Sequence, residues 1–162
     1  MVERPGSLSP ALIAFLEGDT SLMLASTDAA GWPVLGRALA CGVSGDGGRL
    51  TVLLAAAPNA ALLAAVEETG LAALVVNKPS THRSVQFKGR DAAVAPAGKD
   101  AGPTVARHVA GFARDVGLIG FSAAFSRTLT AHDPRGLAAV SFTPEAAFDQ
   151  TPGPRAGDPV EP

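Results

Sequence analysis

The sequence lacks residues that several common kinds of site require. It contains a single cysteine, Cys41, and no tyrosine in 162 residues, so it can form neither an intramolecular disulfide nor a cysteine-rich zinc site. Charged residues make up only 17% of the chain, and the net charge is −2 with no cluster of lysine or arginine. General nucleic-acid binding is therefore not expected, because the phosphate backbone requires a basic surface.

Long apolar runs are missing as well. No run reaches the ~20 residues that a membrane-spanning helix needs. Pro5, Gly6 and Pro10 interrupt the N-terminal segment, which does not follow the charged-then-apolar order of a secretory signal. These features predict a soluble, cytoplasmic protein.

Hydrophobic residues are plentiful, at 47%, but many are alanine, and seven phenylalanines and one tryptophan supply all the aromatic bulk. A core with so few large side chains is often completed by a partner subunit. We expect one domain over residues 1–150, followed by a flexible C-terminal tail over residues 151–162.

Six segments have the composition and length of strands, and tight turns or one helix join most of them. Helices are expected over Ser9–Gly18, Pro58–Thr69, Pro103–Val116 and the region 121–129. The expected strands are Ser21–Thr27, Pro33–Val43, Arg49–Ala55, Leu71–Asn77, Thr81–Val94 and Leu137–Phe142. Because helices are missing between most strands, the pattern predicts a mainly β, α+β fold built as a small antiparallel barrel.

The segment Thr81–Val94 alternates clearly between two kinds of side chain. Val85 and Phe87 fall on one face, which suits a core. The polar residues on the other face are Ser84, Gln86, Lys88 and Arg90. A ligand-binding face and a solvent-exposed sheet face would both give this pattern.

Arg37 lies in the second predicted strand, where strict alternation places it with Leu35, Leu39 and Cys41. A charge on an apolar face is costly unless it is paired. Either a bulge turns Arg37 outward, or it meets an anion, or it pairs with an aspartate near the strand edge.

Asn59 lies at the start of the second predicted helix. Helix N-termini bind phosphate through free N–H groups, although a plain cap is the commoner role of such a residue. Arg37, Arg83 and Lys88 could contact the same phosphate, which favours a phosphorylated planar ligand. The histidines have no metal-ligand spacing, so no metal site is expected.

The order of these elements resembles the FMN-binding split-barrel family, the pyridoxamine 5′-phosphate oxidase-like proteins, over Leu8 to Phe142. The landmarks are Gly31-Trp32-Pro33 leading to Arg37, the strand Leu50–Ala55, the helix opening Ala57-Pro58-Asn59, the segment Thr81–Gly89 and the closing segment Phe148–Pro154. The resemblance implies a six-stranded antiparallel split β-barrel with flanking helices and a homodimer with FMN at the subunit interface.

By the same resemblance, Arg37 and Asn59 would bind the FMN phosphate, and Ala38 and Leu39 would offer backbone groups to the flavin rings. Ser84, Gln86 and Lys88 would complete the cofactor site from the fifth strand. The family's Arg-x-His substrate element is missing, so oxidation of pyridoxamine phosphate itself is not expected.

The function that follows is an FMN-dependent oxidoreductase moving hydride or electrons between a reduced nicotinamide and a small organic acceptor. Three alternatives stay open: a flavin- or haem-binding carrier or sensor, the same fold with a deazaflavin, and an empty scaffold for dimer contacts. The segment Gln150–Pro154 is expected to lie over the dimer interface, anchored by Phe148.

Overall fold

The computed structural model describes residues 7–161. Pro5 and Gly6, on which part of the expected localisation rests, lie outside this range. The helices are α1 (Pro10–Leu16), the short 3₁₀ turn η1 (Ala57–Asn59), α2 (Ala60–Thr69), α3 (Ala101–Leu118) and α4 (Ala123–Leu129). The strands are β1 (Ser21–Thr27), β2 (Pro33–Ala38), β3 (Ala40–Val43), β4 (Leu50–Ala55), β5 (Ala72–Lys78), β6 (Arg83–Gly89), β7 (Ala93–Pro96), β8 (Leu137–Phe142) and β9 (Ala146–Asp149).

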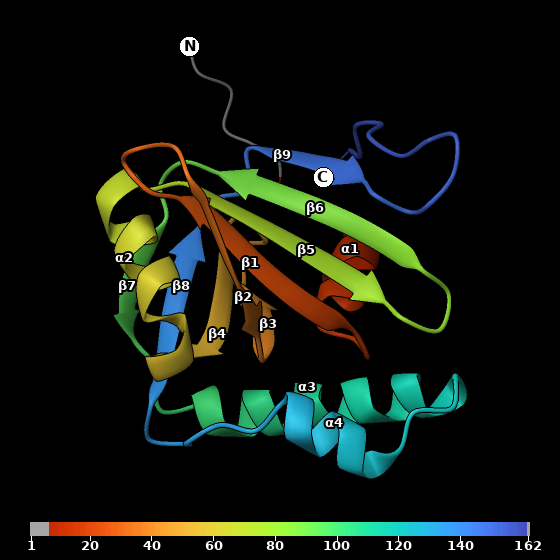
Figure 1. Cartoon of the computed structure of the whole chain (residues 1–162). Helices are drawn as coiled ribbons and strands as arrows, with labels where there is room; N and C mark the ends of the chain where they lie inside the picture. Colours follow the sequence, from red (N-terminus) through yellow and green to blue (C-terminus); the bar gives the residue numbers. More distant parts are fainter. Residues whose placement is uncertain (1–6, 162) are drawn as a thin grey trace.

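The strands form two antiparallel sheets (Figure 1). The large sheet has the order β2-β1-β5-β6-β9, and the small sheet has the order β3-β4-β8-β7. A β-rich, mixed α+β antiparallel fold is thus confirmed. The expected count of six strands is wrong, because the described residues contain nine strands in two sheets, and no closed barrel is formed among them.

Two of the predicted strands each divide between the sheets. Pro33–Val43 breaks at Leu39, whose N–H donates to the carbonyl of Leu53 in β4 at 2.8 Å. The chain turns a corner there, so four consecutive residues from Ala38 to Cys41 are all buried. Strict alternation does not survive such a corner. Cys41 lies in the main core with Ala38, so the prediction that Arg37 shares a face with Cys41 is wrong.

The main core lies between the sheets and is closed by α1 and α2. Leu12 and Leu16 of α1 and Leu62 and Val66 of α2 belong to it. Ser9 caps α1 by accepting a bond from the Leu12 N–H at 3.4 Å, and Gly70 ends α2 with a φ of 69°. Both caps agree with the sequence pattern, because a serine oxygen satisfies a free N–H and glycine tolerates the left-handed region.

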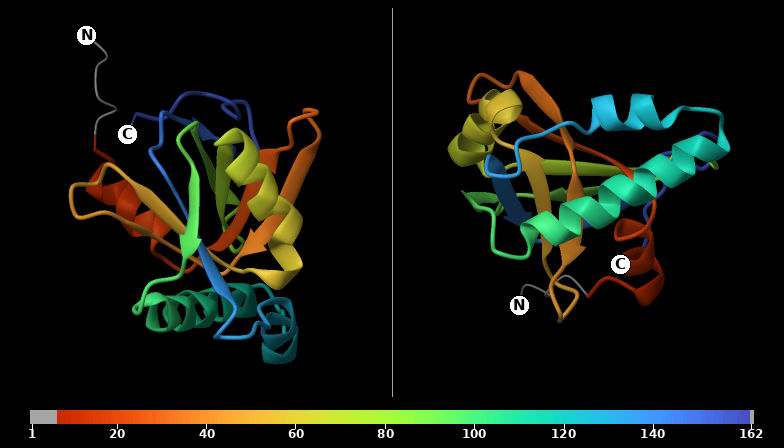
Figure 2. Two further views of the ribbon diagram at one scale, coloured as in Figure 1. Left: turned by 90° about the vertical axis from the view of Figure 1, so that its left-hand side faces the viewer. Right: turned by 90° about the horizontal axis from the view of Figure 1, so that it is seen from below.

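Helix α3 runs beneath the sheets, with α4 beside it (Figure 2). Asp115 on α3 ties it to the turn between β5 and β6. Its carboxylate accepts bonds from the Ser80 N–H at 2.9 Å and the Ser80 hydroxyl at 2.6 Å, and Lys78 Nζ lies 2.8 Å away. Burial alone would raise the pKa of Asp115, but Lys78 and Ser80 outweigh it and lower the pKa below the ordinary value.

His108, also on α3, is a buried histidine whose ring nitrogens bond to no described residue. Desolvation and the nearby charge of Arg107 lower its pKa, against weaker opposing contributions from the Cys41 backbone, Glu17 and Asp19. Burial therefore favours the neutral ring, and the folded protein binds a proton at His108 less readily than the unfolded chain does.

Replacing His108 by leucine is expected to make the free energy of unfolding less dependent on pH on the acid side. In the unfolded chain His108 binds a proton near pH 6.5, whereas the folded chain resists it, so wild-type stability falls as pH drops below about 6.5. Melting temperatures of both proteins between about pH 5 and pH 8 test this. A constant difference between the two proteins across that range would contradict the assignment.

The C-terminal segment is more ordered than the sequence suggests. β9 pairs with β6 from Val85↔Asp149 to Lys88↔Ala146. The chain then turns back, and Phe148 pairs with Pro159 in an isolated bridge. The strand β9 was not predicted from the sequence. A short alanine-rich segment forms a strand there because β6 supplies its hydrogen-bond partners.

Within residues 7–161, no helix has the length and apolar character that crossing a membrane requires.

Candidate functional site

The side of the large sheet that points away from the core, here called the outer face, is the candidate site. Successive strand residues alternate between faces, so the strand register places its residues in rows across the sheet. One row is Leu35, Ala25, Ala73, Lys88 and Ala146. The next is Arg37, Met23, Val75, Gln86 and Phe148.

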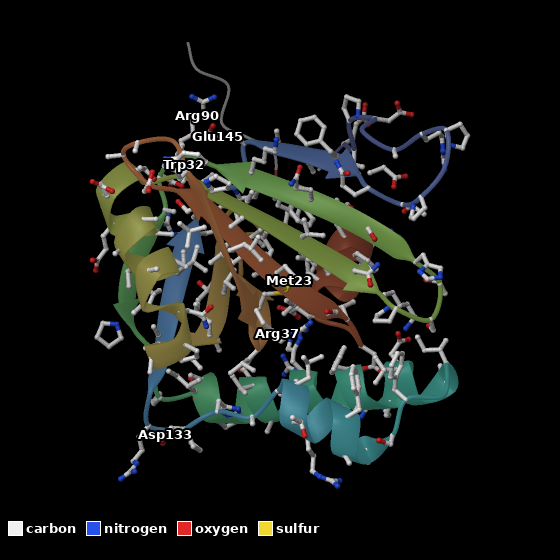
Figure 3. All side chains as sticks on the ribbon, in the orientation of Figure 1. Met23, Trp32, Arg37, Arg90, Asp133 and Glu145 are labelled. Atoms are coloured by element: carbon white, nitrogen blue, oxygen red, sulfur yellow. The ribbon has the colours of Figure 1, made fainter. Side chains whose placement is uncertain are left out.

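Each row is apolar in its middle and polar towards one or both sides. Figure 3 shows Met23 and Arg37 on the side of the sheet that faces the viewer. Arg37 and Gln86 share a row but are separated by β1 and β5, a span of three strand spacings or roughly 14 Å. A planar molecule lying across β1 and β5 would therefore meet small apolar side chains beneath it and hydrogen-bonding groups at both ends.

A cavity of about 560 Å³ opens at one end of the outer face. Its floor includes Ala25, Ala73 and Ala146, and Lys88 and Phe148 line its side. Lys88 Nζ lies 5.3 Å from the centre of the Phe148 ring. A volume of about 300–1,000 Å³ with apolar walls and few polar groups is typical of small-molecule and cofactor sites.

Arg37 lies at the other end of the same face, beside α3. Its Nη1 donates to the Ser21 hydroxyl at 3.1 Å, and its guanidinium lies 5.6 Å from the centre of the Phe112 ring. Partial burial lowers the pKa of Arg37. No carboxylate among the described residues forms an ion pair with it. Its charge is therefore free to meet an anion, and the alternative of a paired aspartate is not realised.

The structure brings three of the predicted cofactor residues onto the outer face: Arg37, Gln86 and Lys88. Ser84 lies one row further along β6, but its hydroxyl is already engaged. It donates to the His82 carbonyl at 2.9 Å, and Asn77 Nδ2 lies 2.7 Å away as a donor. The Ser84 side chain thus supports the strand end, and its part in cofactor binding stays a prediction.

Ala38, Leu39 and Asn59 lie elsewhere. Ala38 is buried in the main core, and Leu39 belongs to a smaller cluster at the corner between the sheets. The Asn59 side chain donates to the Ala55 carbonyl at 2.8 Å and packs against Gly36 on the inner side of β2. Because Gly36 points inward and Arg37 outward, Asn59 and Arg37 do not face one another.

Arg83 is also separated from Lys88. Its guanidinium lies 4.3 Å from the centre of the Phe15 ring of α1, and it lines a second cavity of about 370 Å³ beside the C-terminal segment. The phosphate cluster expected from the sequence is therefore not assembled from Arg37, Arg83, Asn59 and Lys88 within one chain.

Sequence reasoning missed the apolar floor of the site. Ala25 and Ala73 face each other across β1 and β5, and Ala146 ends the same row on β9. The signal was present in β1 and β5, where buried and half-buried residues alternate. It was hard to recognise, because alanine and valine are equally acceptable on both faces of a strand.

The histidines do not form a metal centre. Residues 7–161 contain no group of three or more histidine, cysteine or acidic side chains placed to hold a metal ion. His82 lies in the turn before β6 with a φ of 61° and lines none of the cavities described above. Its position is that of a turn residue.

Comparison of the sequence with protein-family models and with curated proteins found no match. Solved structures do match. A putative pyridoxamine 5′-phosphate oxidase from Lactobacillus delbrueckii has a TM-score of 0.51 at 18% identity, covering 88% of this chain and 93% of that one. A pyridoxamine 5′-phosphate oxidase-related, FMN-binding protein from Nostoc punctiforme has a TM-score of 0.50 at 13% identity, covering 96% and 99%.

The chain shares the fold of pyridoxamine 5′-phosphate oxidase-like proteins. An F420 reductase has the same fold, with a TM-score of 0.53 at 14% identity over 83% of this chain and 93% of that one. The resemblance inferred from the sequence is confirmed at the level of the fold. At such low identity, the pyridoxamine 5′-phosphate oxidase-like fold does not by itself assign a cofactor or a substrate.

Proposed function

We propose that this protein binds a flavin or deazaflavin on the outer face of the large sheet and uses it in electron or hydride transfer. The observation that carries the proposal is the cross-strand row from Arg37 to Gln86, with Met23 and Val75 between them. Two solved structures of the same fold, described as an FMN-binding protein and an F420 reductase, support the choice of cofactor class.

The residues present fit such a group. Flavin rings need an apolar surface, which Ala25, Ala73 and Val75 supply, and the phosphate needs a cation, which Arg37 or Lys88 supplies. The cofactor itself would accept and release the hydride, and the protein would bind and orient it. No acidic side chain or histidine lies on the two rows, so we assign no general acid or base.

A second copy of the chain forms part of the proposal. The residues of the two rows are half-buried or exposed and largely apolar, and among the described elements α3 approaches them beside Arg37. Since the predicted phosphate ligands do not converge within one chain, a homodimer with the cofactor at its interface would bring groups from both copies together.

FMN is the first cofactor to test, and a deazaflavin is the second, since the F420 reductase has the same fold. The visible absorption spectrum of the freshly purified protein is recorded, and FMN or the deazaflavin is then titrated by fluorescence quenching. Binding of either cofactor with micromolar or tighter affinity is expected. A colourless protein that binds neither would contradict the proposal.

Turnover separates an enzyme from a carrier or sensor. With the cofactor bound, reduced nicotinamide is added without air, and the bleaching of the flavin absorbance is followed. We expect bleaching within minutes, followed by reoxidation when a quinone or another small acceptor is supplied. Tight cofactor binding with no bleaching would favour the non-catalytic alternative.

A further inference from the structure

The large hydrophobic side chains that remain exposed fall into two groups. The loop-end patch, beside the cavity of about 560 Å³, consists of Trp32, Leu35 and Leu71. The hairpin patch, around the connection between α3 and α4, consists of Leu118, Ile119, Phe121, Phe125 and Leu129. Trp32 is 72% exposed and Leu118 is 77% exposed, values unusual for side chains of this size.

The two patches lie at opposite ends of the molecule. Figure 3 places Trp32 at the upper end of the large sheet, near Arg90 and Glu145 at the rim of the cavity. Helices α3 and α4 lie beyond the lower end, and α4 stands in front of α3, on the side towards which the outer face looks (Figure 1). Within the hairpin patch, the Phe121 and Phe125 rings stack with their centres 4.4 Å apart.

This placement restricts how two copies can meet through their outer faces. If the hairpin end of one copy met the hairpin end of the other, two hairpins projecting in front of the sheets would compete for the same space. If opposite ends meet, each hairpin reaches the free end of the other sheet. A two-fold interface then pairs the hairpin patch with the loop-end patch twice, so each apolar patch on one chain has a partner on the other.

The shapes of the two patches are also complementary. The cavity is lined by small side chains, with Ala25, Ala73 and Ala146 on its floor, and is open to solvent on one side. The hairpin patch offers a stacked aromatic pair flanked by Leu118 and Ile119. Burial of aromatic side chains in a hollow of small residues is the usual arrangement at the centre of a stable interface.

We propose that the α3–α4 hairpin of a second copy covers the loop-end patch and forms the missing wall of the cavity on the first. The inference rests on the homodimer in the proposed function and adds its orientation. Phe121 and Phe125 of the partner would then line the cavity that contains Lys88. Ligands of this cavity would be planar or apolar molecules able to stack against a phenyl ring.

Crosslinking tests the orientation directly. Leu35→Cys and Phe121→Cys are made in separate chains with different affinity tags and are co-expressed. Cys41 can stay, because it is buried and burial raises the pKa of its thiol to about 12, so it will not react with a maleimide in the folded protein. A short bis-maleimide is then added, and the tags identify which chains are joined.

The expected product joins the Leu35→Cys chain to the Phe121→Cys chain, with little joining of either variant to itself. Efficient joining of Leu35→Cys to itself or of Phe121→Cys to itself would place equal ends together and overturn the proposal. A monomer at crosslinking concentrations, or capture of a different protein by the hairpin, would overturn it as well. None of these results depends on the cofactor titration, so the flavin proposal and the orientation can fail separately.

Trp32 gives a second readout, because it is the only tryptophan. Phe121→Glu is expected to raise the dimer dissociation constant by at least about tenfold and to shift Trp32 emission to longer wavelength at high protein concentration. Ala95→Glu, on the exposed edge strand β7 of the small sheet, is the control and should change neither. Equal effects of the two variants, with far-UV circular dichroism unchanged, would overturn the assignment of the hairpin patch.

Discussion

Replacing Asp115 by alanine is expected to lower the free energy of unfolding by about 3 kcal/mol. The Asp115 side chain is fully buried and holds Lys78 and both donors of Ser80. Removing it leaves a charge and two hydrogen-bond donors without partners, which costs more than the net worth of the contacts. The value lies near the lower end of the usual range because Lys78 is 35% exposed and can turn towards water.

Urea denaturation of wild type and variant measures this loss, and Asp19→Ala is the matched control. Asp19 also contacts an α3 arginine, with Arg114 Nη2 lying 2.8 Å away, but the Arg114 side chain is 64% exposed. An exposed ion pair contributes up to about 1 kcal/mol. Equal losses in the two variants would show that Asp115 does not anchor α3 to the sheet.

Acid should reproduce part of the Asp115 effect in the wild-type protein. The folded-state pKa of this carboxyl is depressed, so its contribution to stability is complete above the unfolded value of about 3.9 and is lost as the pH falls below it. Because α3 carries the hairpin patch, loss of this anchor should also weaken the dimer that we propose.

Replacing Arg37 or Lys88 by alanine is expected to weaken FMN binding by about 1.5–3 kcal/mol for whichever residue contacts the phosphate. This corresponds to a rise in the dissociation constant of roughly 10- to 150-fold. Arg37 has the stronger case, because its charge is half-buried without a carboxylate partner among the described residues. Titration of each variant by flavin fluorescence measures the change.

Arg135→Ala is the control for this pair. Arg135 is a cation of the same kind, but its side chain is 92% exposed beside Asp133. It lies between α4 and β8 and belongs to none of the strands that form the outer face. Its removal should leave the FMN affinity unchanged. If the Arg37 and Lys88 variants both bind FMN as tightly as the wild type, the phosphate assignment is wrong. The apolar floor of the site could then still bind other planar ligands.

Local features of the chain were predicted well because short-range physics decides them. The caps at Ser9 and Gly70, the strand Ser21–Thr27 and the inward positions of Val85 and Phe87 follow from side-chain type and spacing. The polar row of β6 was correctly placed for Gln86 and Lys88. Ser84 was placed on the correct side, but its hydroxyl is engaged by neighbours that the sequence pattern does not specify.

Features that depend on the corners of the fold were predicted poorly. Nothing in the apolar segment from Ala38 to Cys41 indicates where the chain leaves one sheet for the other, because every residue in it suits a buried position. The division of Thr81–Val94 was missed as well, although Gly89-Arg90-Asp91 lies at its break. Each missed corner changes which side a later residue faces, which is why Cys41, after the corner at Leu39, was wrongly placed on the face of Arg37.

The sequence alone therefore determined the secondary structure of most segments, the antiparallel β-rich class and the polar character of β6, since these depend on residue type and periodicity. Only the tertiary structure decided that Arg37 and Gln86 share a row, that Asn59 lies on the opposite side of β2, and that an alanine-lined cavity opens beside Lys88. The reason is physical: a site on a sheet face is assembled from strands adjacent in space, and strand order and register are set by packing across the whole core.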